Sequence, residues 1–161
     1  MSTPDTTAIH RRVAACRAGA DPTRVARLPT GWAVMGDPQV LAGYCLLLPD
    51  PVVPDLNALA AADQAAFLAD MARLGHAVLG LTGAVRVNYA IFGNLEPALH
   101  AHVFPRYSTE PAQFRTAHPW TYDWSRARAF DPGQDGALQH ALRQRLTAGP
   151  DSVPRPGASS V

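Results

Sequence analysis

One long apolar stripe constrains the fold of this chain more than any other feature. Between about Asp55 or Asp63 and Leu81, apolar side chains recur every three or four residues, which is the spacing of one face of an α-helix. Gly80 and Gly83 are suitable helix terminators. A helix with one apolar face must bury it against a second layer. The residues of the stripe are Phe67, Met71, Leu74 and Val78.

Two pairs of strand-like segments flank this helix and can supply the second layer. Residues 31–37 and 43–50 precede the helix, and residues 84–93 and 99–107 follow it. These segments are rich in apolar, β-branched and aromatic residues, with glycine or proline turns around them. A final helix is expected over residues 135–146. This order favours an α+β fold with an antiparallel sheet.

The composition is that of an ordinary globular protein and excludes several functions. The 161 residues are 47% hydrophobic and 17% charged, which suits one domain with a substantial core. The net charge of +1 gives no field that attracts nucleic acid or an anionic membrane, so neither is expected as a partner. We expect one domain over residues 9–148, a flexible tail over residues 1–8 and a disordered tail rich in Pro, Ser and Gly over residues 149–161.

The cysteines and the N-terminus indicate a soluble, cytoplasmic protein. Cys16 and Cys45 belong to no paired motif, so they predict neither a disulfide framework nor a zinc ribbon. The first residues lack the apolar core of a signal peptide. No apolar run approaches the roughly 20 residues of a membrane helix.

Two histidines stand one residue apart in the segment LHAHVFPRY, residues 99–107. Because residues i and i+2 of a strand face the same way, His100 and His102 are expected on one face of the sheet. Together they can serve in metal ligation, acid–base catalysis, nucleophilic attack or phosphate binding, although histidines without a task are the plain alternative. The preceding loop offers Gly93, which lets the backbone approach a ligand, and Asn94, which can donate and accept hydrogen bonds.

A metal site is the less favoured interpretation of this pair. A mononuclear site needs at least a third protein ligand. None of the candidates stands at a recognisable ligand spacing, so the sequence demands no metal. These candidates are His76, His118, Glu96 and Glu110.

The segment NYAIFGNLEPALHAHVFPRY, residues 88–107, resembles the signature of the histidine triad (HIT) superfamily of nucleotidyl hydrolases and transferases. That pattern is an asparagine-bearing strand, a Gly-Gln loop and histidines alternating with apolar residues, often followed by Pro-Arg. The segment GWAVMGDPQVLAGYCLLLPDPVV, residues 31–53, is similar to the family's first hairpin. The resemblance implies a five-stranded antiparallel sheet with a long helix packed across it, and a homodimer whose sheets join across a two-fold axis.

The resemblance also implies roles for individual residues. Gly93 matches the loop glycine, and Asn94 matches the neighbouring glutamine. His100 matches the middle histidine, which is the nucleophile of the family. His102 matches the third histidine, which hydrogen-bonds the scissile phosphate. These residues predict a nucleotide hydrolase or transferase with a histidine nucleophile.

Two positions depart from the family pattern. Ala98 stands at the first position of the triad, and Tyr44 stands where many members carry Gly-His. The nucleophile remains, so the leading hypothesis is a nucleoside-phosphate hydrolase or nucleotidyl transferase acting at the α-phosphate. The implied substrates are dinucleoside polyphosphates, nucleoside phosphoramidates or adenylyl compounds. No cofactor is required, although Mg²⁺ could accompany a polyphosphate substrate.

Two alternative functions stay open on the same residues. The departures at Ala98 and Tyr44 are compatible with a non-catalytic nucleotide-binding module of the same fold. A metal-binding protein built on the His-x-His pair is the third hypothesis.

Four further residues have two interpretations each. Asp37 can accept hydrogen bonds from a ribose, or it is a turn residue before Pro38. Asn88 contacts the site or satisfies backbone groups. Trp32 belongs to a base pocket or to the core. Arg106 reaches a phosphate or forms a surface salt bridge.

Overall fold

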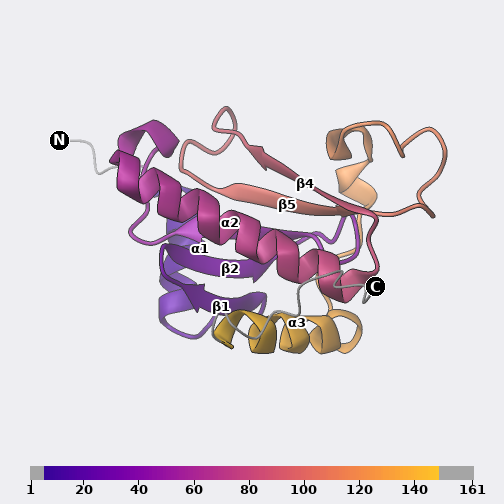
Figure 1. Cartoon of the computed structure of the whole chain (residues 1–161), viewed down its shortest axis with the longest axis horizontal. Coiled ribbons are helices and arrows are strands. Elements are labelled where there is room, and N and C mark those ends of the chain that lie inside the picture. Colours follow the sequence, from indigo (N-terminus) through magenta and orange to yellow (C-terminus); the bar gives the residue numbers. More distant parts are fainter. Residues whose placement is uncertain (1–5, 149–161) are drawn as a thin grey trace, which may run out of the picture.

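The computed structural model describes residues 6–148, which form a five-stranded antiparallel sheet covered by α-helices (Figure 1). The strands lie in the order β1-β2-β3-β5-β4, so β1 and β4 are the two edges. No helix in this part of the chain has the length and apolar character needed to cross a membrane. In chain order the elements are α1 (Ala8–Arg17), β1 (Arg24–Leu28), β2 (Gly31–Met35), β3 (Cys45–Pro49), α2 (Ala61–Thr82), β4 (Arg86–Ile91), β5 (Ala101–Arg106) and α3 (Pro132–Thr147), with short 3-10 helices at Leu56–Ala58, Pro119–Thr121 and Trp124–Arg126.

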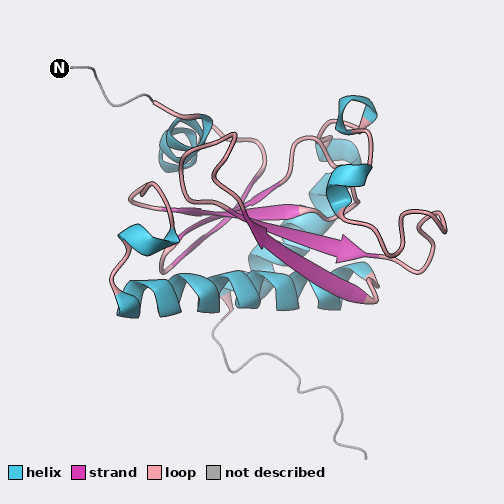
Figure 2. Ribbon diagram, turned by 90° about the horizontal axis from the view of Figure 1, so that it is seen from above, coloured by secondary structure: helices cyan, strands magenta, loops and turns pink. Residues whose placement is uncertain are grey.

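Helices cover both faces of the sheet. The sheet therefore separates the hydrophobic core into two clusters, one on each face. α2 and α3 pack on one face, while α1 and the 3-10 helices after β5 lie on the other (Figure 2). In β3, Cys45 and Leu47 join the cluster under α2, whereas Leu46 and Leu48 join the cluster under α1. A strand that is covered on both faces needs apolar residues at every position. This explains the continuous apolar run of β3.

The predicted fold class is confirmed. The long helix α2 follows β1, β2 and β3 and precedes β4 and β5, and the C-terminal helix α3 packs beside it on the same face. α2 begins at Ala61, whereas Asp55 caps the short helix before it by accepting a hydrogen bond from the Ala58 amide at 2.9 Å. Gly83 ends α2 in the left-handed conformation, with a φ of 69°, which glycine adopts without steric cost.

The sequence analysis did not predict α1 and β1. Thr7 caps α1 by accepting a hydrogen bond from the His10 amide at 3.3 Å, so the helix starts at Ala8, within the expected N-terminal tail. Residues 1–5 and the expected tail at 149–161 lie outside the described residues. The buried side of α1 consists of Ile9, Val13 and Cys16.

A buried ion pair anchors the irregular segment between β5 and α3, residues 107–131. Arg106 Nε and Nη2 each donate to a carboxylate oxygen of Glu110 at 2.9 Å. The same guanidinium donates to the carbonyls of Phe114 at 2.7 Å and Ala117 at 2.8 Å. Arg106 thus forms a salt bridge, but the pair is buried and not on the surface as the sequence interpretation has it, and Arg106 does not line the pocket described below.

Candidate active site

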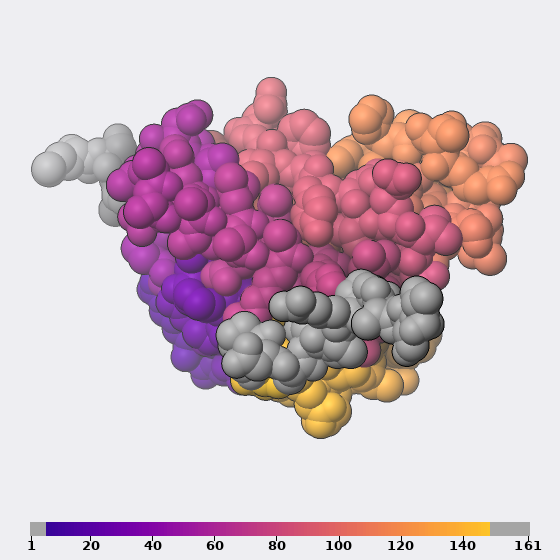
Figure 3. Space-filling view, in the orientation of Figure 1, coloured from indigo at the N-terminus to yellow at the C-terminus, as the bar shows by residue number. Residues whose placement is uncertain are grey.

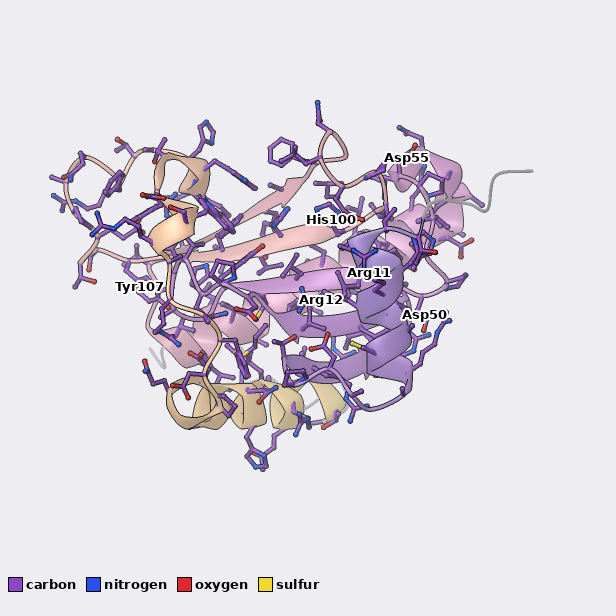
Figure 4. All side chains as sticks on the ribbon, turned by 180° about the vertical axis from the view of Figure 1, so that it is seen from behind. Arg11, Arg12, Asp50, Asp55, His100 and Tyr107 are labelled. Carbon is purple, nitrogen blue, oxygen red and sulfur yellow. The ribbon has the colours of Figure 1, made fainter. Side chains whose placement is uncertain are left out.

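His102 lies on β5 and His100 directly precedes this strand, and both rings lie on the face of the sheet that α1 also covers. Ala101 and Val103 point to the opposite face and are fully buried beneath α2. The rings of His100 and His102 lie side by side, with centroids 4.8 Å apart and planes at 73°. Figure 4 shows His100 on this face, near the end of α1. The shared face that the sequence predicts is thus present.

A pocket of about 610 Å³ opens over these rings. Its walls are formed by the loop after β4, by His100 and His102, and by the segment that follows β5. Figure 3, which views the α2 face, shows a notch in the outline of the molecule between the pink loop after β4 and the orange segment after β5. The lining residues are Phe92, Asn94, Leu95, Glu96, His100, His102, His118 and Trp120. The pocket can therefore admit a ligand directly onto the two imidazoles.

His100 is held by the backbone two residues before it. Its Nδ1 lies 2.8 Å from the carbonyl oxygen of Ala98, and only 7% of the residue is exposed. A carbonyl oxygen can only accept a hydrogen bond, so Nδ1 carries a proton and donates it. In the neutral ring the lone pair then resides on Nε2, the nitrogen left for the pocket. Ala98 thus contributes through its backbone, while its side chain packs in the cluster beneath α1.

His102 is held by the hydroxyl of a tyrosine that directly precedes the neighbouring strand β3. Its Nδ1 lies 2.7 Å from the hydroxyl oxygen of Tyr44. Burial lowers the pKa of His102 to about 4, and the adjacent His100 shifts it in the same direction. Because this pKa lies well below 7, His102 is neutral near pH 7. It can therefore serve as a hydrogen-bonding group and not as a fixed positive charge.

Aromatic side chains surround His102 and form one wall of the pocket. Phe104 stacks on the His102 ring at 5.6 Å, and Trp120 meets it edge-on at 5.1 Å. Trp120 also meets Phe92 edge-on at 4.9 Å across the pocket. These rings exclude water from one side of His102, which accounts for its lowered pKa.

Of the residues that the sequence predicts for the site, three line the pocket directly: His100, His102 and Asn94. Gly93 adjoins Asn94, but its φ is not positive and a Cβ there would meet no atom within 4 Å. The structure thus shows no conformational need for glycine at this position. Asn88 pairs with Phe104 in the sheet and shares the histidine face, yet it lies outside the pocket lining.

Two candidates lie away from the pocket. Asp37 accepts a hydrogen bond from the Phe130 amide at 2.9 Å and ties the end of β2 to the start of α3. This contact fits its interpretation as a turn residue, and Asp37 does not line the pocket. Trp32 donates from Nε1 to Asp50 at 2.9 Å, beneath the guanidinium of Arg27.

Five residues that line the pocket are not among the site residues that the sequence predicts: Phe92, Leu95, Glu96, His118 and Trp120. Phe92 lies at the end of the segment predicted as a strand, and Leu95 and Glu96 lie in the loop after it, where no pattern tells which side chains face inward. His118 and Trp120 come from a segment without periodicity, where the aromatic cluster PWTYDW, residues 119–124, was the available signal.

The metal-ligand candidates do not gather into a metal site. Within residues 6–148, no three side chains of histidine, cysteine, aspartate or glutamate are grouped so as to hold a metal ion. Glu110 is engaged by Arg106, and His76 lies on α2, on the opposite side of the sheet. His118 and Glu96 share the pocket with the two histidines without forming such a group.

Comparison with known proteins gives the same fold. No protein-family model matches the sequence, and no curated protein matches it. A histidine triad protein from Bradyrhizobium japonicum is 24% identical, with 81% of this chain and 94% of that chain covered and a TM-score of 0.67. One from Marinobacter aquaeolei is 20% identical, with 87% and 96% covered and a TM-score of 0.69.

A third solved structure comes from an archaeon. A hypothetical histidine triad nucleotide-binding protein from Sulfolobus tokodaii is 14% identical, with 83% of this chain and 89% of that chain covered and a TM-score of 0.65. Similarity at these identities defines the fold. The chain has the histidine triad fold, as the motif in residues 88–107 predicts.

Proposed function

We propose that this chain is a nucleoside-phosphate hydrolase or nucleotidyl transferase that uses His100 as its nucleophile. The observation that carries the proposal is the hydrogen bond from His100 Nδ1 to the Ala98 carbonyl at 2.8 Å. This bond leaves the lone pair on Nε2 of a ring that lines an open pocket. The absent first histidine of the triad does not alter this contact, because the contact uses the backbone of residue 98.

The reaction follows from that geometry in two displacements. In the first, Nε2 of His100 attacks the α-phosphorus, and the bond from phosphorus to the leaving oxygen or nitrogen breaks. The leaving group keeps the bonding electrons and takes a proton from solvent. In the second, water or an acceptor alcohol attacks phosphorus and releases its proton to solvent, the phosphorus–nitrogen bond breaks, and its electron pair returns to Nε2. The Ala98 carbonyl stabilises the positive charge that develops on the ring.

His102 and Asn94 complete the proposed site. Both line the pocket and can donate hydrogen bonds to the non-bridging phosphate oxygens. A well-placed donor of this kind contributes about 3 kcal/mol to the transition state. Candidate substrates are dinucleoside polyphosphates, nucleoside phosphoramidates and adenylyl compounds, and any Mg²⁺ would enter with the phosphates of a polyphosphate substrate.

We also propose a homodimer that forms through the free edge of β4. Exposed apolar side chains lie on and next to this edge strand, since Tyr89 on β4 is 43% exposed and Val85, directly before β4, is 66% exposed. A second copy of the chain that pairs with this edge would extend the sheet and cover both residues.

A substrate panel tests the proposed function. The wild-type protein, His100→Ala and the control His140→Ala, which alters an exposed histidine on α3, are assayed on the three substrate classes, and AMP binding is measured by calorimetry. We expect turnover of at least one class by wild type and by His140→Ala, and a loss of at least about 1,000-fold in His100→Ala. Equal inactivity of all three proteins with retained AMP binding would establish the non-catalytic binding module instead.

A further inference from the structure

We propose that Tyr44 is a positioning residue that keeps the proton of His102 on Nε2, so that this ring presents an N–H to the phosphate in the pocket. The catalytic part of this inference, the binding of phosphate by the N–H of His102, rests on the proposed function. The tautomer itself is a property of the free protein and can be tested without any substrate.

The direction of the hydrogen bond follows from counting donors and acceptors. Tyr44 is 3% exposed, and within residues 6–148 its hydroxyl has one hydrogen-bond partner, His102 Nδ1 at 2.7 Å. If Nδ1 carried the proton, the hydroxyl would accept it, and its own proton would be buried without an acceptor. Such an unpaired donor costs about 1–3 kcal/mol. The hydroxyl therefore donates to Nδ1, and the single proton of the neutral ring resides on Nε2.

Both partners of this bond are neutral near pH 7. Burial lowers the pKa of His102 to about 4 and raises the pKa of the Tyr44 hydroxyl above its usual value. Neither group ionises in the physiological range. The proton position on His102 is consequently decided by the hydrogen bond and not by a change of charge.

The hydrogen-bond partners of His100 and His102 therefore give the two rings opposite roles. At His100 a carbonyl accepts from Nδ1 and leaves a lone pair on Nε2. At His102 a hydroxyl donates to Nδ1 and leaves an N–H on Nε2. One ring is set up to attack phosphorus, and the other is set up to bind the oxygens that gain charge during the attack.

Neighbouring residues hold the Tyr44 ring in one position. Phe104 stacks on Tyr44 with centroids 4.5 Å apart and planes at 8°, and Trp124 meets it edge-on at 5.7 Å. Gly36 lies against the ring so closely that a Cβ at this position would stand 2.0 Å from the Tyr44 ring carbon Cδ1. Residue 36 must therefore lack a side chain for Tyr44 to occupy this position.

Nitrogen-15 NMR of the histidine side chains tests the inference directly. In the wild-type protein we expect His102 to show a protonated Nε2 and an unprotonated, hydrogen-bonded Nδ1 at pH 7. In Tyr44→Phe, which removes only the hydroxyl, we expect this fixed pattern to be lost and kcat to fall about tenfold with little change in KM, the effect of one hydrogen bond in the transition state. Tyr107→Phe is the matched control, because Tyr107 donates to the Ala42 carbonyl and lies away from His100 (Figure 4).

Two results would overturn the inference. One is a wild-type spectrum in which His102 carries its proton on Nδ1. This measurement needs only the wild-type protein, so it can be made even if Tyr44→Phe fails to fold. The other is a Tyr44→Phe protein with an unchanged His102 tautomer and an unchanged kcat. A catalytically inactive wild type with the expected spectrum would contradict the proposed function and leave the role of Tyr44 in place.

Discussion

At the scale of single residues, the neighbouring imidazoles of His100 and His102 differ mainly in the atom that each Nδ1 contacts. The contact of His100 is with a residue two positions earlier in the segment before β5, so it follows from the local backbone. The contact of His102 comes from Tyr44, which stands 58 residues earlier in the chain. The motif in residues 88–107 could therefore predict His100, His102 and Asn94, whereas the role of Tyr44 depends on the pairing of β3 with β5.

The lowered pKa of His102 predicts a dependence of stability on pH. The unfolded chain protonates this histidine near its ordinary value of 6.5, but the folded protein does so only near 4. Between these values the unfolded state binds more protons, so the folded state loses stability as pH falls from about 6.5 to 4. The shift corresponds to about 3 kcal/mol at most.

Urea unfolding of wild type and His102→Asn at pH 7.5 and at pH 4.5 measures this contribution. We expect wild type to lose about 2 kcal/mol more than the variant between the two pH values. Equal losses in the two proteins would mean that His102 titrates normally in the folded state.

At the scale of elements, the segment over residues 107–131 is a wall of the pocket whose position depends on a buried ion pair. In Glu110→Ala, the guanidinium of Arg106 would be buried without its partner, because the two side chains are only 7% and 4% exposed. We expect the free energy of unfolding to fall by about 3–5 kcal/mol and the KM for nucleotide to rise, since the wall that carries Trp120 loses its anchor.

Trp120→Ala separates the two effects of that change. Because Trp120 lines the pocket, its removal should raise KM. Because it is 42% exposed, its removal should change the free energy of unfolding far less than Glu110→Ala does. Chemical denaturation and steady-state kinetics on both variants provide the comparison. An unchanged KM in both would contradict the assignment of this segment to the site.

The elements also show where pattern reasoning succeeds and fails. α2, β3 and β5 carry long periodic or continuous apolar signals, and the structure has each of them. α1 is short and rich in arginine, with three buried side chains, and so gives a weak signal. The segment over residues 107–131 has no period, because its course is set by hydrogen bonds from the Arg106 side chain to Glu110, Phe114 and Ala117 and not by a repeating apolar face.

At the scale of the whole molecule, the exposed edge of β4 leads to a prediction about assembly. Light scattering coupled to size-exclusion chromatography should give the mass of a dimer for the wild type. Val85→Lys should shift the protein toward the monomer without loss of folded structure, because a charge next to the edge strand β4 opposes strand pairing and Val85 is 66% exposed. A wild-type monomer at micromolar concentration would contradict the proposed dimer.

The most direct test of the central claim is to trap the covalent intermediate. Wild-type protein is mixed with a turned-over substrate from the panel, quenched within milliseconds at alkaline pH and digested for mass spectrometry. The account predicts a nucleoside monophosphate attached to His100, with no such adduct in His100→Ala. Substrate turnover with the same rate in both proteins and no adduct on His100 would contradict it.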